Sequence, residues 1–175
     1  MNLKLNSINT ISREHLISRL AKAYFNVLQA IDLNNPDISS GIKEGLNKFL
    51  SNLAIHIQGK YKITSADYIS NNALLQIQQG NTSNLVYEHM VPKQRYIQMP
   101  CITQANAGCL TYEYVYNLLS KYWYISIITG DEDTKLNKLN LRQNMPNNWD
   151  FTDIFARYVK ANIQLISTND VNKSL

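Results

Sequence analysis

The sequence predicts an α+β domain, with a helical N-terminal half and a small sheet in the C-terminal half. In the first 80 residues, apolar side chains recur at intervals of three and four, as on one face of a helix. Compact strand-like runs occur only later, at residues 85–91 and 124–128. We therefore expect a helical hairpin and a third helix, packed with a two- to three-stranded sheet and further helices.

Three helices are expected in the N-terminal half. The first spans residues 12–31, and the Asn/Asp-rich turn around Pro36 ends it. The second spans residues 40–57 and is closed by Gly59. The third spans residues 65–79, with Ser65 as its cap.

The C-terminal half is expected to alternate short strands with helices. Residues 93–109 look irregular because Pro100 and Gly108 interrupt them. Residues 111–122 fit both a strand and a helical face, and the smooth continuation through Leu118 and Lys121 favours the helix.

The clearest strand, at 124–128, runs into Thr129-Gly130-Asp131-Glu132, a capping box that opens a helix to about residue 139. A last helix, capped by Asp150 or Thr152, is expected to end at residue 161, and a third strand to cover 163–166.

The whole chain, residues 1–175, is expected to form a single domain. No composition shift marks a linker, and the polar segments 1–9 and 167–175 are expected to be flexible ends. In the turn at residues 145–150 and just beyond it, Trp149 and Phe155 are expected to anchor the chain on the core.

Composition and charge limit the possible classes of protein but do not identify a partner. With 17 basic and 13 acidic residues, the net charge of +4 suits nucleic acid or an acidic protein partner but demands neither. Cys101 and Cys109 lie too far apart for a zinc knuckle and suggest a reducing compartment, so we expect a cytoplasmic protein. No run approaches the roughly 20 apolar residues of a membrane span. The abundance of Asn, Ile, Lys and Tyr is typical of an AT-rich bacterial or phage genome.

One short string combines an acid and a histidine at the end of a strand. The chain has three histidines, and His89 is the one that sits beside a carboxylate, Glu88, at the end of a strand, which Pro92 then stops. Near neutral pH an imidazole can accept a proton or bind a metal ion. His89 could equally be a structural imidazole that bonds a backbone carbonyl or Glu88.

The string Glu88-His89-Met90-Val91-Pro92 resembles the first part of the HNH, or His-Me finger, nuclease motif. The resemblance implies catalytic roles for His89, as the base that activates water, and for Glu88. It also implies that Glu88, His89 and Asn137 hold Mg²⁺ or Mn²⁺. It covers five residues, and no histidine downstream of His89 replaces the family's final metal ligand.

Other polar groups have two interpretations each. Lys93, Arg95 and Arg157 are candidate phosphate contacts, although Arg157 could instead be a buried ion-pair partner. The acids at residues 131–133 could bind a metal ion or simply complement the dipole of the helix they begin.

These observations support two hypotheses about function. The first is a metal-dependent nuclease-like or nucleic-acid-processing protein. The alternative is a non-catalytic interaction protein, such as an immunity protein, an inhibitor or a phage accessory factor, which binds a protein partner. The tyrosines of residues 112–124 suit either one, because such rings stack on bases and also favour protein interfaces. A third possibility is non-enzymatic nucleic-acid binding through the basic surface.

Overall fold

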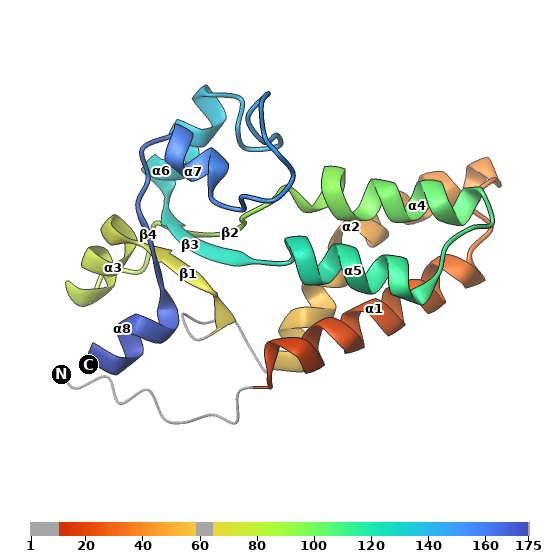
Figure 1. Ribbon diagram of the computed structural model, residues 1–175, viewed down its shortest axis with the longest axis horizontal. Helices are drawn as coiled ribbons and strands as arrows, with labels where there is room; N and C mark the ends of the chain where they lie inside the picture. Colours follow the sequence, from red (N-terminus) through yellow and green to blue (C-terminus); the bar gives the residue numbers. More distant parts are fainter. Residues whose placement is uncertain (1–10, 59–64, 175) are drawn as a thin grey trace.

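The structure is a computed structural model that describes residues 11–58 and 65–174. It confirms the α+β class: one group of helices lies on the right of Figure 1, and the sheet with its own helices lies on the left. The expected lead-in at residues 1–9 and the helix end at Gly59 fall outside the described residues. No helix in the described part is long and apolar enough to cross a membrane.

The helical group packs around a large apolar core that includes Leu20, Tyr24 and Leu50. The first predicted helix is confirmed, and Ser12 caps it by accepting a hydrogen bond from the His15 backbone N–H. The second begins earlier than expected, at Pro36, because proline suits a first helical turn, where no N–H partner is needed. The group consists of α1 (Arg13–Ala30), α2 (Pro36–Gln58), the π-helical turn η2 (Gln94–Gln98), α4 (Met99–Asn106) and α5 (Tyr112–Tyr122).

Four strands form one mixed sheet within the described residues, in the order β2-β3-β1-β4, so the expectation of two or three strands was too low. The central strands β1 and β3 are parallel, and each edge strand is antiparallel to its neighbour. The strands are β1 (Tyr68–Ser70), β2 (Leu85–His89), β3 (Ile125–Thr129) and β4 (Leu165–Ser167).

The prediction of a helix over residues 65–79 was wrong in its first part. Residues 68–70 form β1, because β3 and β4 pair with them from both sides. The helix α3 (Asn71–Gln78) starts only afterwards, and its cap is Ser70, whose Oγ accepts the Ala73 N–H at 3.0 Å. Pairing between distant segments therefore overrides the local helical pattern.

Three further expectations needed correction. Residues 93–109 are mostly helical, because Pro100 lies in the first turn of α4, where its missing N–H costs no hydrogen bond. The last helix, which was expected to end at residue 161, is the short helix α7 (Ala156–Lys160). Residues 167–174, which were expected to belong to a flexible end, lie in the last position of β4 and in the helix α8 (Thr168–Ser174).

The predicted capping box is confirmed and extends further than the sequence indicated. Glu132, in α6 (Gly130–Lys138), is buried, and its Oε2 accepts the Thr129 N–H at 2.9 Å and the Ser70 hydroxyl at 2.6 Å. Its Oε1 accepts the side-chain N–H of Asn72 at 3.0 Å. Because Ser70 itself caps α3, one carboxylate joins the N-termini of two helices that follow the parallel strands.

Replacing Glu132 by Gln is expected to lower the free energy of unfolding by about 1–3 kcal/mol, because an amide nitrogen cannot accept and at least one of its three donors loses its acceptor. Chemical denaturation measures this. The matched control is Asp131→Asn, an exposed acid in the same helical turn, which is expected to change stability by less than about 1 kcal/mol. Equal effects of the two changes would contradict the joint role of Glu132.

Candidate functional site

The sequence-predicted site lies at the end of β2, where the strand leaves the sheet. Antiparallel pairing sets Glu88 opposite Ser126 and His89 opposite Ile125. The backbone N–H of Met90 still bonds the Tyr124 carbonyl at 2.8 Å, and the chain then turns at Pro92. The predicted strand is therefore confirmed over residues 85–89 and ends two residues before its expected end at 91.

Glu88 is paired with Arg157, at 2.8 Å between Oε1 and NH2. The Arg157 side chain is 0% exposed. Of the two interpretations of Arg157 that the sequence allowed, the structure therefore supports the buried ion-pair partner. Burial raises the pKa of Glu88, and the nearby guanidinium opposes that rise. A carboxylate in this setting holds an arginine in place.

The rest of the Arg157 guanidinium bonds backbone carbonyls. Its Nε donates to Met90 O at 2.9 Å, and NH1 donates to Leu141 O and Arg142 O at 2.9 and 3.0 Å. NH2 also donates to the carbonyl of His89. The side chain thus connects α7 to the end of β2 and to the segment after α6.

His89 faces α2, and Glu88 is not among its hydrogen-bond partners. Its Nε2 lies 3.2 Å from the hydroxyl oxygen of Ser51, and its ring packs edge-on against Trp123 at 4.6 Å. Its Nδ1 is closed off from solvent and has no hydrogen-bond partner. Burial, reinforced by Lys93 and Arg157, lowers the pKa of His89 to about 3. The imidazole is therefore neutral at cellular pH and is a weak base.

The three remaining candidate residues lie apart from Glu88. Lys93 is partly buried, and its Nζ donates to Ser51 Oγ at 2.8 Å and to the Asn47 carbonyl. Arg95 is exposed and donates to the side chain of Asn144. Asn137 lies on the exposed side of α6, and its described contacts join it to neighbours along the chain.

In these positions the candidate residues do not form a set of ligands for Mg²⁺ or Mn²⁺. Such ions take several oxygen ligands in a tight shell, whereas one oxygen of Glu88 is bound to Arg157 and Asn137 lies elsewhere. In the described part of the chain, no group of three or more His, Cys, Asp or Glu side chains could hold a metal ion. The assignment of the protein as a metal-dependent nuclease therefore remains a prediction, and the positions of the candidate ligands add no support to it.

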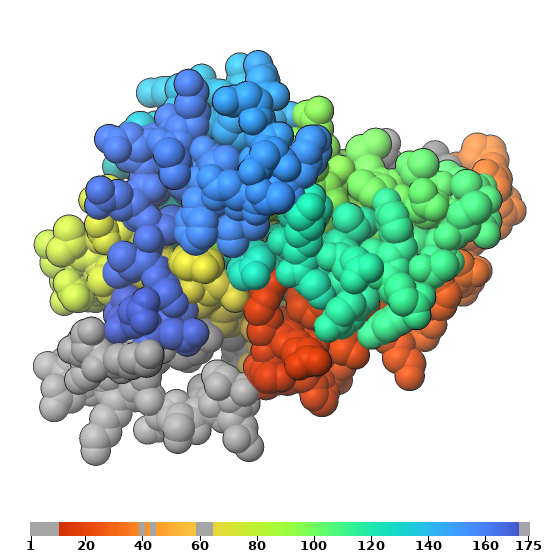
Figure 2. All heavy atoms as spheres, in the orientation of Figure 1, coloured from red at the N-terminus to blue at the C-terminus, as the bar shows by residue number. Residues whose placement is uncertain are grey.

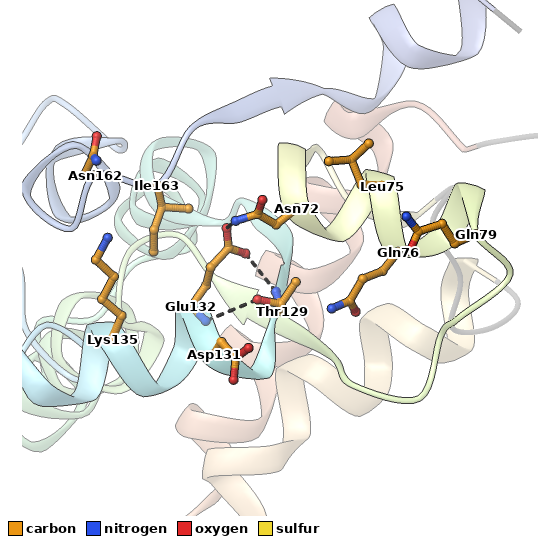
Figure 3. A pocket seen from close by; sticks show the side chains of 10 residues that line it. All are labelled: Asn72, Leu75, Gln76, Gln79, Thr129, Asp131, Glu132, Lys135, Asn162 and Ile163. Atoms are coloured by element: carbon orange, nitrogen blue, oxygen red, sulfur yellow. Dashed lines mark hydrogen bonds between the residues drawn. The ribbon is translucent and has the colours of Figure 1, made fainter.

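A hollow of about 400 Å³ opens beside Glu132, at the carboxyl ends of the parallel strands (Figure 3). Ligands often bind at this edge of a sheet, but here the oxygens of Glu132 are already bound by helix caps. The residues that line it are Asn72, Leu75, Gln76, Gln79, Thr129, Asp131, Glu132, Lys135, Asn162 and Ile163.

The three acids that begin α6 point to different partners. Asp131 borders the hollow, Glu132 caps the helix, and Asp133 pairs with Arg142 at 3.2 Å. Of the three acids, Glu132 therefore serves the start of the helix directly.

A patch of four aromatic rings covers the junction between α5, η2 and the loop before α7. We call Tyr96, Tyr122, Trp149 and Phe151 the aromatic patch. Trp149 lies at its centre, 5.0 Å from Tyr96, 5.7 Å from Tyr122 and 5.1 Å from Phe151. Trp149 is buried, which confirms its predicted role as an anchor, whereas Phe151 is 56% exposed.

Phe155, the second predicted anchor, packs edge-on against Tyr68 at 4.9 Å and so joins the same loop to the sheet.

Comparison with protein-family models, with curated proteins and with solved structures finds no match to this chain.

The folded protein is expected to lose stability as the pH falls from about 6.5 towards 3. In that window the unfolded chain protonates His89 and the folded chain does not, which removes up to about 1.4 kcal/mol per pH unit. Unfolding free energies of the wild type and His89→Gln, measured at several pH values, should converge towards low pH. His15→Gln, at an exposed position of α1, is the control. Parallel curves for wild type and His89→Gln would show that burial does not hold His89 neutral.

Proposed function

We propose that this protein acts by binding another protein, and that the exposed part of the aromatic patch, at Phe151, is the binding surface. The observation that carries the proposal is Phe151, a large apolar side chain that is 56% exposed while its backbone has a φ of 63°. A residue with a Cβ is strained in this left-handed region, by about 1–2 kcal/mol. Exposure of a large apolar side chain and backbone strain both cost free energy in the folded protein, and together they favour a role in contact with a partner.

The loop holds Phe151 in this conformation by contacts on both sides. The Tyr122 hydroxyl donates to the Phe151 carbonyl at 3.1 Å, and the Trp149 indole donates to the Asp153 carbonyl at 2.7 Å. The Asp150 carboxylate accepts the Thr152 hydroxyl and two backbone N–H groups, which lowers the pKa of Asp150 to about 2. A rigid aromatic loses little entropy on binding and so makes an efficient anchor.

The surroundings of the patch suggest the chemistry of the partner. The segment that contains Phe151, coloured blue in Figure 2, lies at the surface against the end of α5. The guanidinium of Arg95 lies 5.7 Å from the ring of Tyr96, and the ammonium of Lys121 lies 5.2 Å from that of Tyr122. Apolar anchors bordered by cations fit an apolar pocket with an acidic rim on the partner protein.

Phe151→Asn tests this directly, because asparagine tolerates the left-handed backbone and removes only the ring. A partner is first isolated with the wild-type protein from its native host and purified, and its dissociation constant is then measured for each variant. If Phe151 is a binding hot spot, its loss should weaken binding by roughly 30-fold or more, with the unfolding midpoint unchanged.

Ile38→Asn is the matched control, since Ile38 is also an exposed apolar residue, at 39%, but lies on α2. It should leave the dissociation constant unchanged. Failure to isolate any protein partner, or a partner that binds Phe151→Asn as tightly as wild type, would overturn the proposal. Tight binding of a single-stranded oligonucleotide that Phe151→Asn abolishes would assign the patch to nucleic acid instead.

A further inference from the structure

Three side chains with catalytic chemistry converge away from the aromatic patch, between α2 and the end of β2. Ser51 comes from the second half of α2, His89 from the last position of β2, and Lys93 from the turn before η2. Ser51 Oγ lies 2.8 Å from Lys93 Nζ and 3.2 Å from His89 Nε2. All three residues have intermediate exposure, and the two hydrogen bonds that join them are partly buried.

Lys93 has the position and the proton affinity of a general base. Desolvation lowers its pKa to about 8, so a substantial fraction is neutral slightly above neutral pH. None of the ion pairs found among the described side chains involves Lys93. A neutral amine 2.8 Å from a hydroxyl can accept its proton, as activation of a serine nucleophile requires.

His89 is fixed as a hydrogen-bond donor towards the same oxygen. It is neutral, its ring is held by Trp123, and its Nδ1 has no partner and no access to solvent. A buried N–H without an acceptor is costly, so the tautomer with hydrogen on Nε2 is favoured. That N–H lies 3.2 Å from Ser51 Oγ, so it is a donor beside the atom that a substrate carbonyl would approach.

We propose that Ser51 is a nucleophile that takes acyl groups from small carboxylic esters or thioesters, with Lys93 as its general base. The Ser51 hydroxyl proton moves to Lys93 Nζ while Oγ bonds the acyl carbon, and His89 Nε2–H stabilises the resulting oxyanion. Lys93 then returns the proton to the leaving alcohol or thiol as the bond to it breaks, which leaves acyl-Ser51. Water releases the acid by the same proton route.

A surface for the acyl chain lies next to these residues. Tyr87 is two positions before His89 on β2, so the two side chains lie on the same face of the strand. Tyr87 is 42% exposed on this edge strand, and its ring offers an apolar contact. This favours short acyl or aryl esters as substrates over charged ones.

The experiment uses p-nitrophenyl acetate as the probe, with mass spectrometry of the acid-quenched protein to locate acetyl groups. One acetyl group per chain should form on Ser51, at a rate that rises as the pH passes about 8. Ser51→Ala and Lys93→Met should lower that rate by roughly 100-fold or more.

Lys93→Arg separates catalysis from structure, because arginine can keep the hydrogen bonds to Ser51 and Asn47 but cannot act as a base. It should fold normally and still fail to acetylate Ser51, whereas added methylamine should restore acetylation in Lys93→Met. Ser18→Ala and Lys160→Met are matched controls, and both should react like wild type. Absence of an acetyl group on Ser51, acetylation of Lys93 in its place, or full reactivity in Lys93→Arg would each overturn the proposal.

Discussion

The geometry at the end of β2 depends on one buried arginine. Arg157 reaches from α7 to the carbonyls of His89 and Met90, to the Glu88 carboxylate, and to the two carbonyls that follow α6. A guanidinium can satisfy so many acceptors at once because its donors form a rigid planar fork. Without it, these buried oxygens would lose their partners while the strand end lost its anchor.

This arrangement separates the roles of the acid and the histidine that are adjacent in the sequence. Glu88 and His89 are neighbours in the chain, but they face different surroundings: Glu88 binds Arg157, and His89 faces Ser51 on α2. A role shared by the two side chains would require them to converge on one ligand. The chemistry that the structure brings together instead involves His89 with Ser51 and Lys93.

Local signals predicted much of the fold. The helical faces of α1, α2 and α5, the strand β3 and the Thr129–Glu132 capping box are all encoded within a few residues. The strand β1 was missed because three residues carry too little pattern, and its pairing partners lie more than 50 positions away. Pro100 was taken as a breaker because its position within α4 depends on where η2 begins.

The candidate site was predictable only in part, for the same reason. Its strand-end position follows from the apolar run and Pro92, but Arg157 lies 69 positions from Glu88 and Ser51 lies 38 from His89. An arginine within the apolar run Phe155-Ala156-Arg157-Tyr158 did indicate a buried partner. A serine in the middle of an amphipathic helix gave no comparable signal.

Arg157 organises this region, and Glu88 serves it as a structural partner. The most direct measurement is the free energy of unfolding of Arg157→Met beside that of Glu88→Gln. Arg157→Met is expected to lose about 3–5 kcal/mol. Glu88→Gln is expected to lose about 1 kcal/mol, because its amide oxygen can still accept from Arg157. An Arg157→Met protein as stable as the wild type would rule out this organising role and leave Glu88 available for another one.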